Sequence, residues 1–338
     1  MRLLTAVSLA AACLVAVVAV TAATRHYEDE EQELAKSLEA LVAAGMPGAL
    51  VRVRDGDRTI ELARGEARPG IRFRVASLTK TFVAALTLRL ADRGVLSLDD
   101  PVASYLPGLL HDGDRITVRR LLNHTAGLFD YTGDPELLRG ELPPRALIRI
   151  AERRERTTGY AYSSTNYLVL GLVLEKTTGM RLGELLRREV FQPFGLDDTT
   201  FEAGRVDGPH LHGHALATRD VVATGSLHDT SERPATSAWA AAAVVSTAAD
   251  LERFMSVLKT SGLAARMAPP QGARYGLGLG RAQLTCGPAL SHTGNLLGTV
   301  TVVRAHRDRI SVVAGNVYPF TREVGERFAE LLELAGCS

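Results

Sequence analysis

Apolar and polar positions follow strand-like and helix-like periods that divide the chain into two sheet-forming ends and a helical middle. Residues 29–44 have apolar positions at helical spacing, and residues 48–65 form two alternating runs around Asp55-Gly56-Asp57, a pattern typical of a β-hairpin. Near the other end, three strand-like runs and an amphipathic helix occupy residues 274–284, 296–306, 309–318 and 321–336. Strands are therefore expected from both ends of the chain.

The middle of the chain has a different pattern. A long apolar helix follows Ser77 and is closed by Gly94, and residues 95–250 are mostly helix and loop. Elements in this order predict an α/β (α+β) fold: an antiparallel sheet built from both termini, flanked by helices, with an inserted helical lobe at about 95–250. No internal repeat or low-complexity linker divides residues 24–338, so we expect one domain.

The first 23 residues have the form of a secretory signal: one early cation, a long apolar run, and small residues before a polar stretch. Cleavage is expected near Ala22 or Ala23, which predicts a secreted protein. The run is also long enough to remain as an anchor on the outer face of the cytoplasmic membrane. Lipidation of Cys13 is disfavoured because Ala10 stands where a large aliphatic residue is preferred.

The charge balance restricts the classes of binding partner, and the cysteine content bears on the redox compartment of the protein. The 338 residues are 46% hydrophobic, and 39 Lys plus Arg nearly balance 38 Asp plus Glu. This balance gives no nucleic-acid surface and no polybasic membrane patch, so membrane contact is expected only if the N-terminal segment is retained. After signal removal two cysteines remain, Cys286 and Cys337; they form a disulfide in an oxidising compartment, or else two buried thiols.

The first candidate chemistry lies in "FRVASLTKTFVAAL", where Ser77 and Lys80 stand at the start of a helix. The first N–H groups of a helix lack internal partners, so a serine placed there keeps its own N–H available for an oxyanion. Lys80, one turn on, faces Ser77, and burial would lower its proton affinity toward that of a base. The alternative is a capping serine and a solvated lysine. A second Ser-x-x-Lys, Ser256 to Lys259, lies inside a helical pattern and lacks the free N–H.

Two further stretches favour the catalytic interpretation. "YAYSSTNYLVLG" places Tyr162 just before an apolar helix, and "LSHTGNLLGTVTVV" places His292-Thr293-Gly294 on or beside a core strand. With these motifs in this order, the chain resembles the serine penicillin-recognising hydrolases, which include class C β-lactamases, secreted D-alanyl-D-alanine carboxypeptidases and related esterases. The resemblance spans roughly residues 30 to 336, and "HTG" and "YGLGLGRAQLTCG" are most similar to the carboxypeptidases.

The resemblance implies a role for each matching residue. Ser77 would be the acylated nucleophile, and Lys80 and Tyr162 would share the proton transfers, either being the base. His292 and Thr293 would hold the substrate carboxylate and its hydrogen bonds. The N–H of Asn295 would complete the oxyanion hole with that of Ser77, and Gly294 would let the substrate backbone lie along the strand edge.

Two positions depart from the family pattern. Ser164 stands where the second motif has asparagine, and a serine hydroxyl is shorter and offers one donor. In an alternative register Asn166 would be the motif residue, inside the helix. The carboxypeptidases carry an arginine in the "YGLGL" segment, and the nearest here is Arg281, just after it.

Several other residues have weaker candidate roles. His210, His212 and His214 alternate in a loop without nearby acidic or cysteine ligands, which disfavours a metal site. We expect a structural role for His124. The aromatic residues Trp239 and Phe129 are candidate cleft walls, with buried packing as the alternative.

The sequence therefore predicts a secreted serine hydrolase that acts through an acyl-enzyme without a metal or organic cofactor. A monomeric D-alanyl-D-alanine carboxypeptidase, acting on peptidoglycan peptides and acylated by β-lactams, is the leading interpretation. The alternatives are an esterase or class C-type β-lactamase on the same site, for which Ser164 favours the esterase, and an inactive penicillin- or peptidoglycan-binding module.

Overall fold

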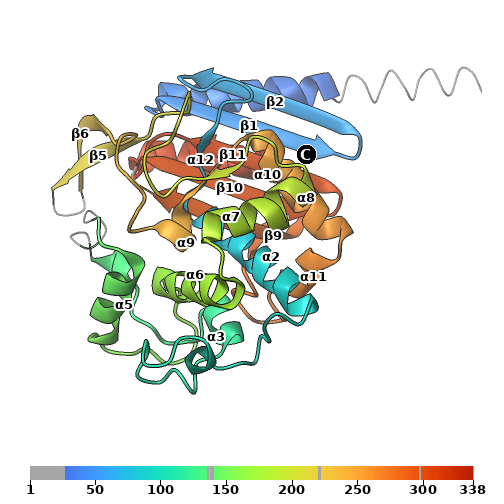
Figure 1. The fold of residues 1–338 in the computed structure, drawn as a ribbon. Helices are drawn as coiled ribbons and strands as arrows, with labels where there is room; N and C mark the ends of the chain where they lie inside the picture. The colour runs from blue at the N-terminus through green and yellow to red at the C-terminus, as the bar shows by residue number, and fades with distance from the viewer. Residues whose placement is uncertain (1–26, 135–136, 138–140, 220–221, 297, 338) are drawn as a thin grey trace, which may run out of the picture.

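A six-stranded antiparallel sheet forms the centre of the computed structural model, which describes residues 27–134, 137, 141–219, 222–296 and 298–337 (Figure 1). Its strand order is β2-β1-β11-β10-β9-β8, so the N-terminal hairpin pairs directly with the last strand, and Val51 lies opposite Val313. The strands are β1 (Gly48–Asp55), β2 (Arg58–Gly65), β8 (Gly280–Leu284), β9 (Gly287–Leu296), β10 (Thr299–His306) and β11 (Arg309–Gly315). The predicted sheet built from both termini is confirmed.

Helices cover both faces of this sheet. The helix at residues 27–43 and α12 (Arg322–Cys337) pack on one face, where side chains such as Leu38 and Phe328 meet the strand valines. On the other face, α10 (Ala248–Thr260) and α2 (Thr79–Asp92) join a larger apolar core that continues into the helical lobe (Figure 1). Helix α2, which follows Ser77, is therefore buried between the sheet and the lobe.

The inserted lobe is mostly helical, as predicted. Its helical elements are η2 (Val102–Ser104), α3 (Val118–Leu122), η3 (Tyr131–Gly133), α5 (Pro144–Glu152), α6 (Ser164–Thr178), α7 (Leu182–Leu186), η4 (Arg187–Phe191), α8 (Gln192–Phe194) and α9 (Trp239–Ala242). The range 95–250 also contains the strands β4 (Thr200–Phe201), β5 (His214–Arg219), β6 (Val222–Asp229) and β7 (Val244–Ser246). The C-terminal part of the predicted lobe is thus mixed, and α11 (Leu263–Met267) follows α10.

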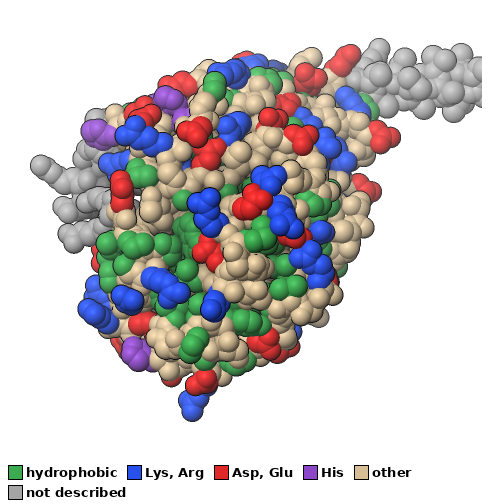
Figure 2. Space-filling view, in the orientation of Figure 1, with side chains coloured by type: hydrophobic (Ala, Val, Ile, Leu, Met, Phe, Trp, Pro, Cys, Tyr) green, Lys and Arg blue, Asp and Glu red, His purple; other side chains and the backbone are tan. Residues whose placement is uncertain are grey.

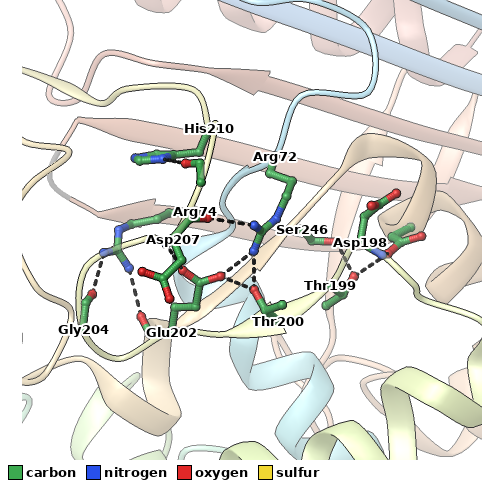
Figure 3. A network of polar contacts seen from close by, with 12 residues as sticks. Arg72, Arg74, Asp198, Thr199, Thr200, Glu202, Gly204, Asp207, His210 and Ser246 are labelled. Atoms are coloured by element: carbon green, nitrogen blue, oxygen red, sulfur yellow. Dashed lines mark hydrogen bonds and ion pairs between the residues drawn. The ribbon is translucent and has the colours of Figure 1, made fainter.

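A small sheet behind the helix start anchors the chain that leads to Ser77. Strand β3 (Phe73–Arg74) pairs with β7, which also pairs with β4. Figure 3 shows the polar network around it: buried Arg74 donates to the carbonyls of Glu202 (3.2 Å) and Gly204 (2.8 Å), while Arg72 pairs with the Glu202 carboxylate. Because these bonds join segments about 130 residues apart, they hold β3 in place just before the Ser77 turn.

A disulfide joins the end of α12 to the turn between β8 and β9. Cys286 and Cys337 are bonded, with their Cα atoms 5.6 Å apart, which confirms the predicted bridge. The signal-peptide prediction for residues 1–23 lies outside the described residues. Within the described part of the chain, none of the helices combines the length and the apolar character needed to cross a membrane. On the face seen in Figure 2, Lys and Arg side chains are interspersed with those of Asp and Glu.

Candidate active site

The Ser77 side chain lies on a tight turn that leads directly into α2. A single 3₁₀ turn, η1 (Ala76–Leu78), precedes the helix, and Ala76 adopts a positive φ of 50°. Lys80 lies one turn further on, and its Nζ donates to Ser77 Oγ (2.9 Å) and to the Ala241 carbonyl (3.1 Å). The sequence prediction that Lys80 reaches Ser77 from the same helix face is therefore correct in its geometry.

The amine of Lys80 is fully buried in an aromatic pocket. Its Nζ lies 5.1 Å from the centre of the Tyr162 ring and 5.8 Å from that of Tyr167. Desolvation lowers the pKa of Lys80 to about 7, although the negative charge of Asp130 acts in the opposite direction. A large fraction of the amine is therefore neutral near pH 7, which is the state required to accept a proton from Ser77.

Tyr162 lies at the mouth of the same site, just before α6. Burial of its hydroxyl raises the pKa of Tyr162 well above the ordinary value, while a hydrogen bond with Ser77 lowers it in part. The phenol is thus protonated near neutral pH. His124 packs its ring 4.2 Å from that of Tyr162, and its Nδ1 accepts the Ser163 N–H (3.2 Å). His124, whose φ is +59°, supports the tyrosine loop, in line with the predicted structural role.

Strand β9 brings the third motif against the Ser77 turn. Pairing between β8 and β9 ends at Ser291, so the β9 edge beyond it is left open toward the site. His292 and Gly294 are buried, whereas Thr293 and Asn295 are exposed and line a cavity of about 380 Å³ together with Ser77. The described residues that line it are Ser77, Tyr162, Arg274, Tyr275, Gly280, Arg281, Ala282, Ser291, His292, Thr293, Asn295 and Arg304.

His292 is neutral in this environment. Burial and the nearby Lys80 lower its pKa to about 3. Its Nδ1–H donates to the Thr293 carbonyl (3.0 Å), and its Nε2 accepts from the Tyr275 hydroxyl (2.8 Å). Both ring nitrogens are engaged within the protein, so His292 orients the site without offering a positive charge to a carboxylate. Cationic side chains for an anionic substrate must come from elsewhere.

The cavity contains residues that sequence reasoning had not singled out. Tyr275, within the "YGLGL" segment, is the hydrogen-bond partner of His292, and the arginines Arg274 and Arg304 join Arg281 in the lining. Arg281 is exposed and donates to the Pro269 carbonyl (3.2 Å). Tyr275 could be suspected from its place beside the motif glycines, whereas Arg304, on β10, carries no local signal.

Several candidate residues lie outside the lining of this cavity, including Lys80 beneath Ser77 and Gly294 on β9. Ser164 begins α6, is 4% exposed and donates its N–H to Asp130 (3.1 Å). Asn166, the motif residue of the alternative register, is fully buried inside α6 with its Nδ2 3.2 Å from His124 Nδ1. Trp239 packs over Gly171, where an added Cβ would meet its ring at 2.7 Å, and Phe129 lies under Arg154. Both aromatic residues serve packing rather than the wall of this cavity.

The alternating histidines are arranged separately. His214 Nε2 contacts the Glu66 carboxylate (2.8 Å), and His212 Nδ1 contacts Asp229 (3.3 Å). Among the described residues, no group of three or more His, Cys, Asp or Glu side chains is placed to hold a metal ion.

A serine bonded to a buried lysine, a tyrosine at the mouth and an open strand edge opposite them match one family of hydrolases. The Beta-lactamase family profile matches residues 31–335. The chain belongs to the Beta-lactamase family. The curated relatives in this family are penicillin-binding proteins and hydrolases of the same fold. The chain is therefore a serine hydrolase related to the class C enzymes.

The curated relatives match this chain over only part of their own length. Penicillin-binding protein 4* of Bacillus subtilis is 32% identical over 152 residues, which are 42% of this chain and 33% of that protein. Penicillin-binding protein 4 of Amycolatopsis lactamdurans is 35% identical over 45% of this chain and 44% of its own length. The chain thus spans less than half the length of these curated relatives.

Solved structures match over nearly the whole described fold. A D-stereospecific amidohydrolase from Streptomyces sp. superposes with a TM-score of 0.76 and 31% identity, covering 87% of this chain and 96% of that one. The D-amino acid amidase of Ochrobactrum anthropi SV3 gives a TM-score of 0.79 at 23% identity, over 90% and 98% of the two chains, which shows a shared fold.

Proposed function

We propose that the protein hydrolyses D-alanyl-D-alanine-type peptides as a serine carboxypeptidase and is acylated by β-lactams. The observation that carries this proposal is the buried Lys80 amine, 2.9 Å from Ser77 Oγ, with a pKa lowered to about 7. A neutral amine at this position is the base that a serine nucleophile needs.

The reaction proceeds in two balanced steps. Ser77 Oγ attacks the carbonyl carbon of the scissile amide while Lys80 takes its proton, and the oxyanion is held by the N–H groups of Ser77 and Asn295. The C–N bond then breaks, and the proton passes through the Tyr162 hydroxyl to the departing amine. A water molecule hydrolyses the ester by the same route in reverse, which releases the acid and restores Ser77.

Charge in the cavity supports an anionic substrate. Arg274, Arg281 and Arg304 line it, and no Asp or Glu is among the described lining residues. The C-terminal carboxylate of the substrate would be held by Arg281 and the exposed Thr293 hydroxyl, since both nitrogens of His292 are engaged.

A second candidate is hydrolysis of D-amino acid amides. It is favoured by the likeness to the Streptomyces D-stereospecific amidohydrolase, which covers 96% of that chain. The position of Ser164 outside the lining also suits substrates that lack an acyl-side amide. An esterase or a β-lactamase would use the same nucleophile, and the comparison of substrates described next distinguishes these activities as well.

Two measurements test these functions. Incubation with a fluorescent penicillin should label the wild-type protein and leave Ser77→Ala unlabelled; equal labelling would exclude Ser77 as the acylated residue. Steady-state turnover of a diacyl-D-Ala-D-Ala peptide, D-alanine amide, an aryl ester and nitrocefin then ranks the activities. Failure on all four, together with binding of cell-wall fragments, would favour a binding module instead.

We also propose that the protein is exported and is a monomer. Residues 1–23 support export, either with signal cleavage or with retention as an anchor. Determination of the mature N-terminus from culture supernatant and from the membrane fraction distinguishes the two cases. Elution of the exported protein on a calibrated sizing column tests the expected monomer.

A further inference from the structure

A second cavity adjoins the one at Ser77. It has a volume of about 450 Å³ and is lined by Asn123, Thr125, Tyr160, Pro270, Gly272, Ala273, Arg274 and Tyr275. Arg274 and Tyr275 line both cavities, so they form the boundary between them. The site at Ser77 therefore continues past Tyr275 into a space that the catalytic steps alone do not require.

Arg274, at the boundary between the two cavities, carries a positive charge that takes no part in the proposed catalytic steps. It is exposed, and its guanidinium forms no ion pair with any carboxylate of the described residues. Its charge acts on Tyr160, across the second cavity, whose pKa is raised mainly by burial and lowered in part by Arg274. No Asp or Glu is among the described residues that line this cavity. An anionic group entering here would meet an arginine without displacing an existing partner.

The second cavity borders Tyr275, which packs against the tyrosine that would protonate the departing amine. In the proposed reaction Tyr162 passes the proton to that amine, so the leaving group must stand beside the Tyr162 hydroxyl. Tyr275 packs against this tyrosine, with ring centres 6.0 Å apart, and Tyr160 is only two residues before it. A leaving group that extends beyond Tyr162 and Tyr275 therefore enters the second cavity.

We propose that the Arg274–Tyr160 cavity is a leaving-group subsite for a residue bulkier than alanine that carries a side-chain carboxylate. The proposal rests on the proposed acyl-enzyme function and deepens it, because it names the departing half of the substrate. Arg274 determines this specificity by pairing with the carboxylate, while Tyr160, Pro270 and Ala273 contact its aliphatic part. Arg281 keeps its separate role at the terminal carboxylate.

Matched peptides test the charge preference. Three substrates share one diacyl-D-Ala donor and differ in the departing residue, which is D-Ala, D-Gln or D-Glu. For the wild-type protein, kcat/KM should be about threefold to fivefold higher for D-Glu than for D-Gln, as expected for a partly exposed ion pair. In Arg274→Gln this ratio should fall to about one. Arg153→Gln, at an exposed arginine that lines neither cavity, should keep the wild-type ratio.

A steric variant tests the location independently. Ala273→Trp fills the second cavity from an exposed loop position, so it should slow D-Gln and D-Glu release severalfold relative to D-Ala release. Absence of a D-Glu preference in the wild type, or its persistence in Arg274→Gln, would overturn the subsite. If all three peptides are inert and the fluorescent penicillin fails to label Ser77, the acyl-enzyme function itself is wrong, which is a separate result.

Discussion

Gly294 and Val75 touch backbone to backbone. A Cβ atom added at Gly294 would lie 2.0 Å from the Val75 carbonyl oxygen and 3.1 Å from the Ser77 nitrogen. Strand β9 thus presses directly on the turn that carries the nucleophile, and the family's third-motif glycine is needed here because no side chain fits. This contact sets the distance across the predicted oxyanion hole, between the N–H groups of Ser77 and Asn295.

Gly294→Ala should therefore separate β9 from the Ser77 turn. We expect labelling by fluorescent penicillin to fall at least 100-fold, with a loss of stability in the range of about 1–3 kcal/mol that is typical of overpacking. Labelling rates and urea unfolding check this. Gly204→Ala is the matched control, since an added Cβ there meets nothing within 4 Å. Equal labelling of the two variants would contradict the proposed closeness.

The rate of acylation should depend on the protonation of Lys80. Because the pKa of Lys80 is lowered to about 7, kcat/KM should rise with pH through an apparent pKa near 7 and then level. Stopped-flow acylation between pH 5 and 9 measures the profile. A rate that still rises steadily up to pH 9 would instead indicate an ordinary, solvated lysine.

Replacement of Lys80 should also stabilise the protein. The pKa of Lys80 in the folded protein lies below its unfolded value of 10.5, so the unfolded chain binds more protons than the folded one between about pH 7 and 10. The free-energy cost of burying the charged amine is therefore largest below pH 7, where Lys80 is protonated in both states. Lys80→Met should abolish acylation and raise the free energy of unfolding, by on the order of a few kcal/mol at pH 6 and less at pH 9.5. Lys176→Met, at an exposed lysine, should do neither.

Tyr275→Phe should weaken the positioning of the third motif, although Tyr275 itself takes no part in the reaction. It removes the hydroxyl that donates to His292 Nε2 at 2.8 Å, which leaves a buried acceptor unpaired at a cost of about 1–3 kcal/mol. We expect lower thermal stability and a severalfold slower acylation. Tyr318→Phe, at a half-buried tyrosine remote from the cavity, provides the comparison. Unchanged stability in Tyr275→Phe would show that the hydrogen bond is dispensable.

Loss of the Cys286–Cys337 bridge should release α12 from the β8–β9 turn. The two cysteines are 51 residues apart, for which chain entropy predicts a loss of about 4 kcal/mol on reduction. Denaturant unfolding with and without dithiothreitol measures it, and the Cys286→Ala/Cys337→Ala double variant should be insensitive to the reductant. A stability that the reductant leaves unchanged would mean that the bridge adds little to the native state.

Periodic patterns in the chain were sufficient for the architecture. The hairpin at 48–65, the C-terminal strands and the last helix were predictable because each buries one face, and burial of one face imposes a period of two or of about 3.6 on the sequence. Ser77 and Lys80 could be paired for the same reason, since three residues along a helix bring side chains to one face. The cysteine pair followed from the two cysteines that remain after the expected signal removal, in an oxidising compartment.

Only the tertiary structure decided the surroundings of these residues. The hydrogen bond between Tyr275 and His292, the burial that makes the pKa of Lys80 suit a base, and the meeting of Arg274, Arg281 and Arg304 all join segments distant in the chain. The packing of Trp239 and Phe129 away from the cavity was equally hidden. Desolvation and long-range contacts depend on how the sheet and the lobe close on each other, and no local period in a sequence records them.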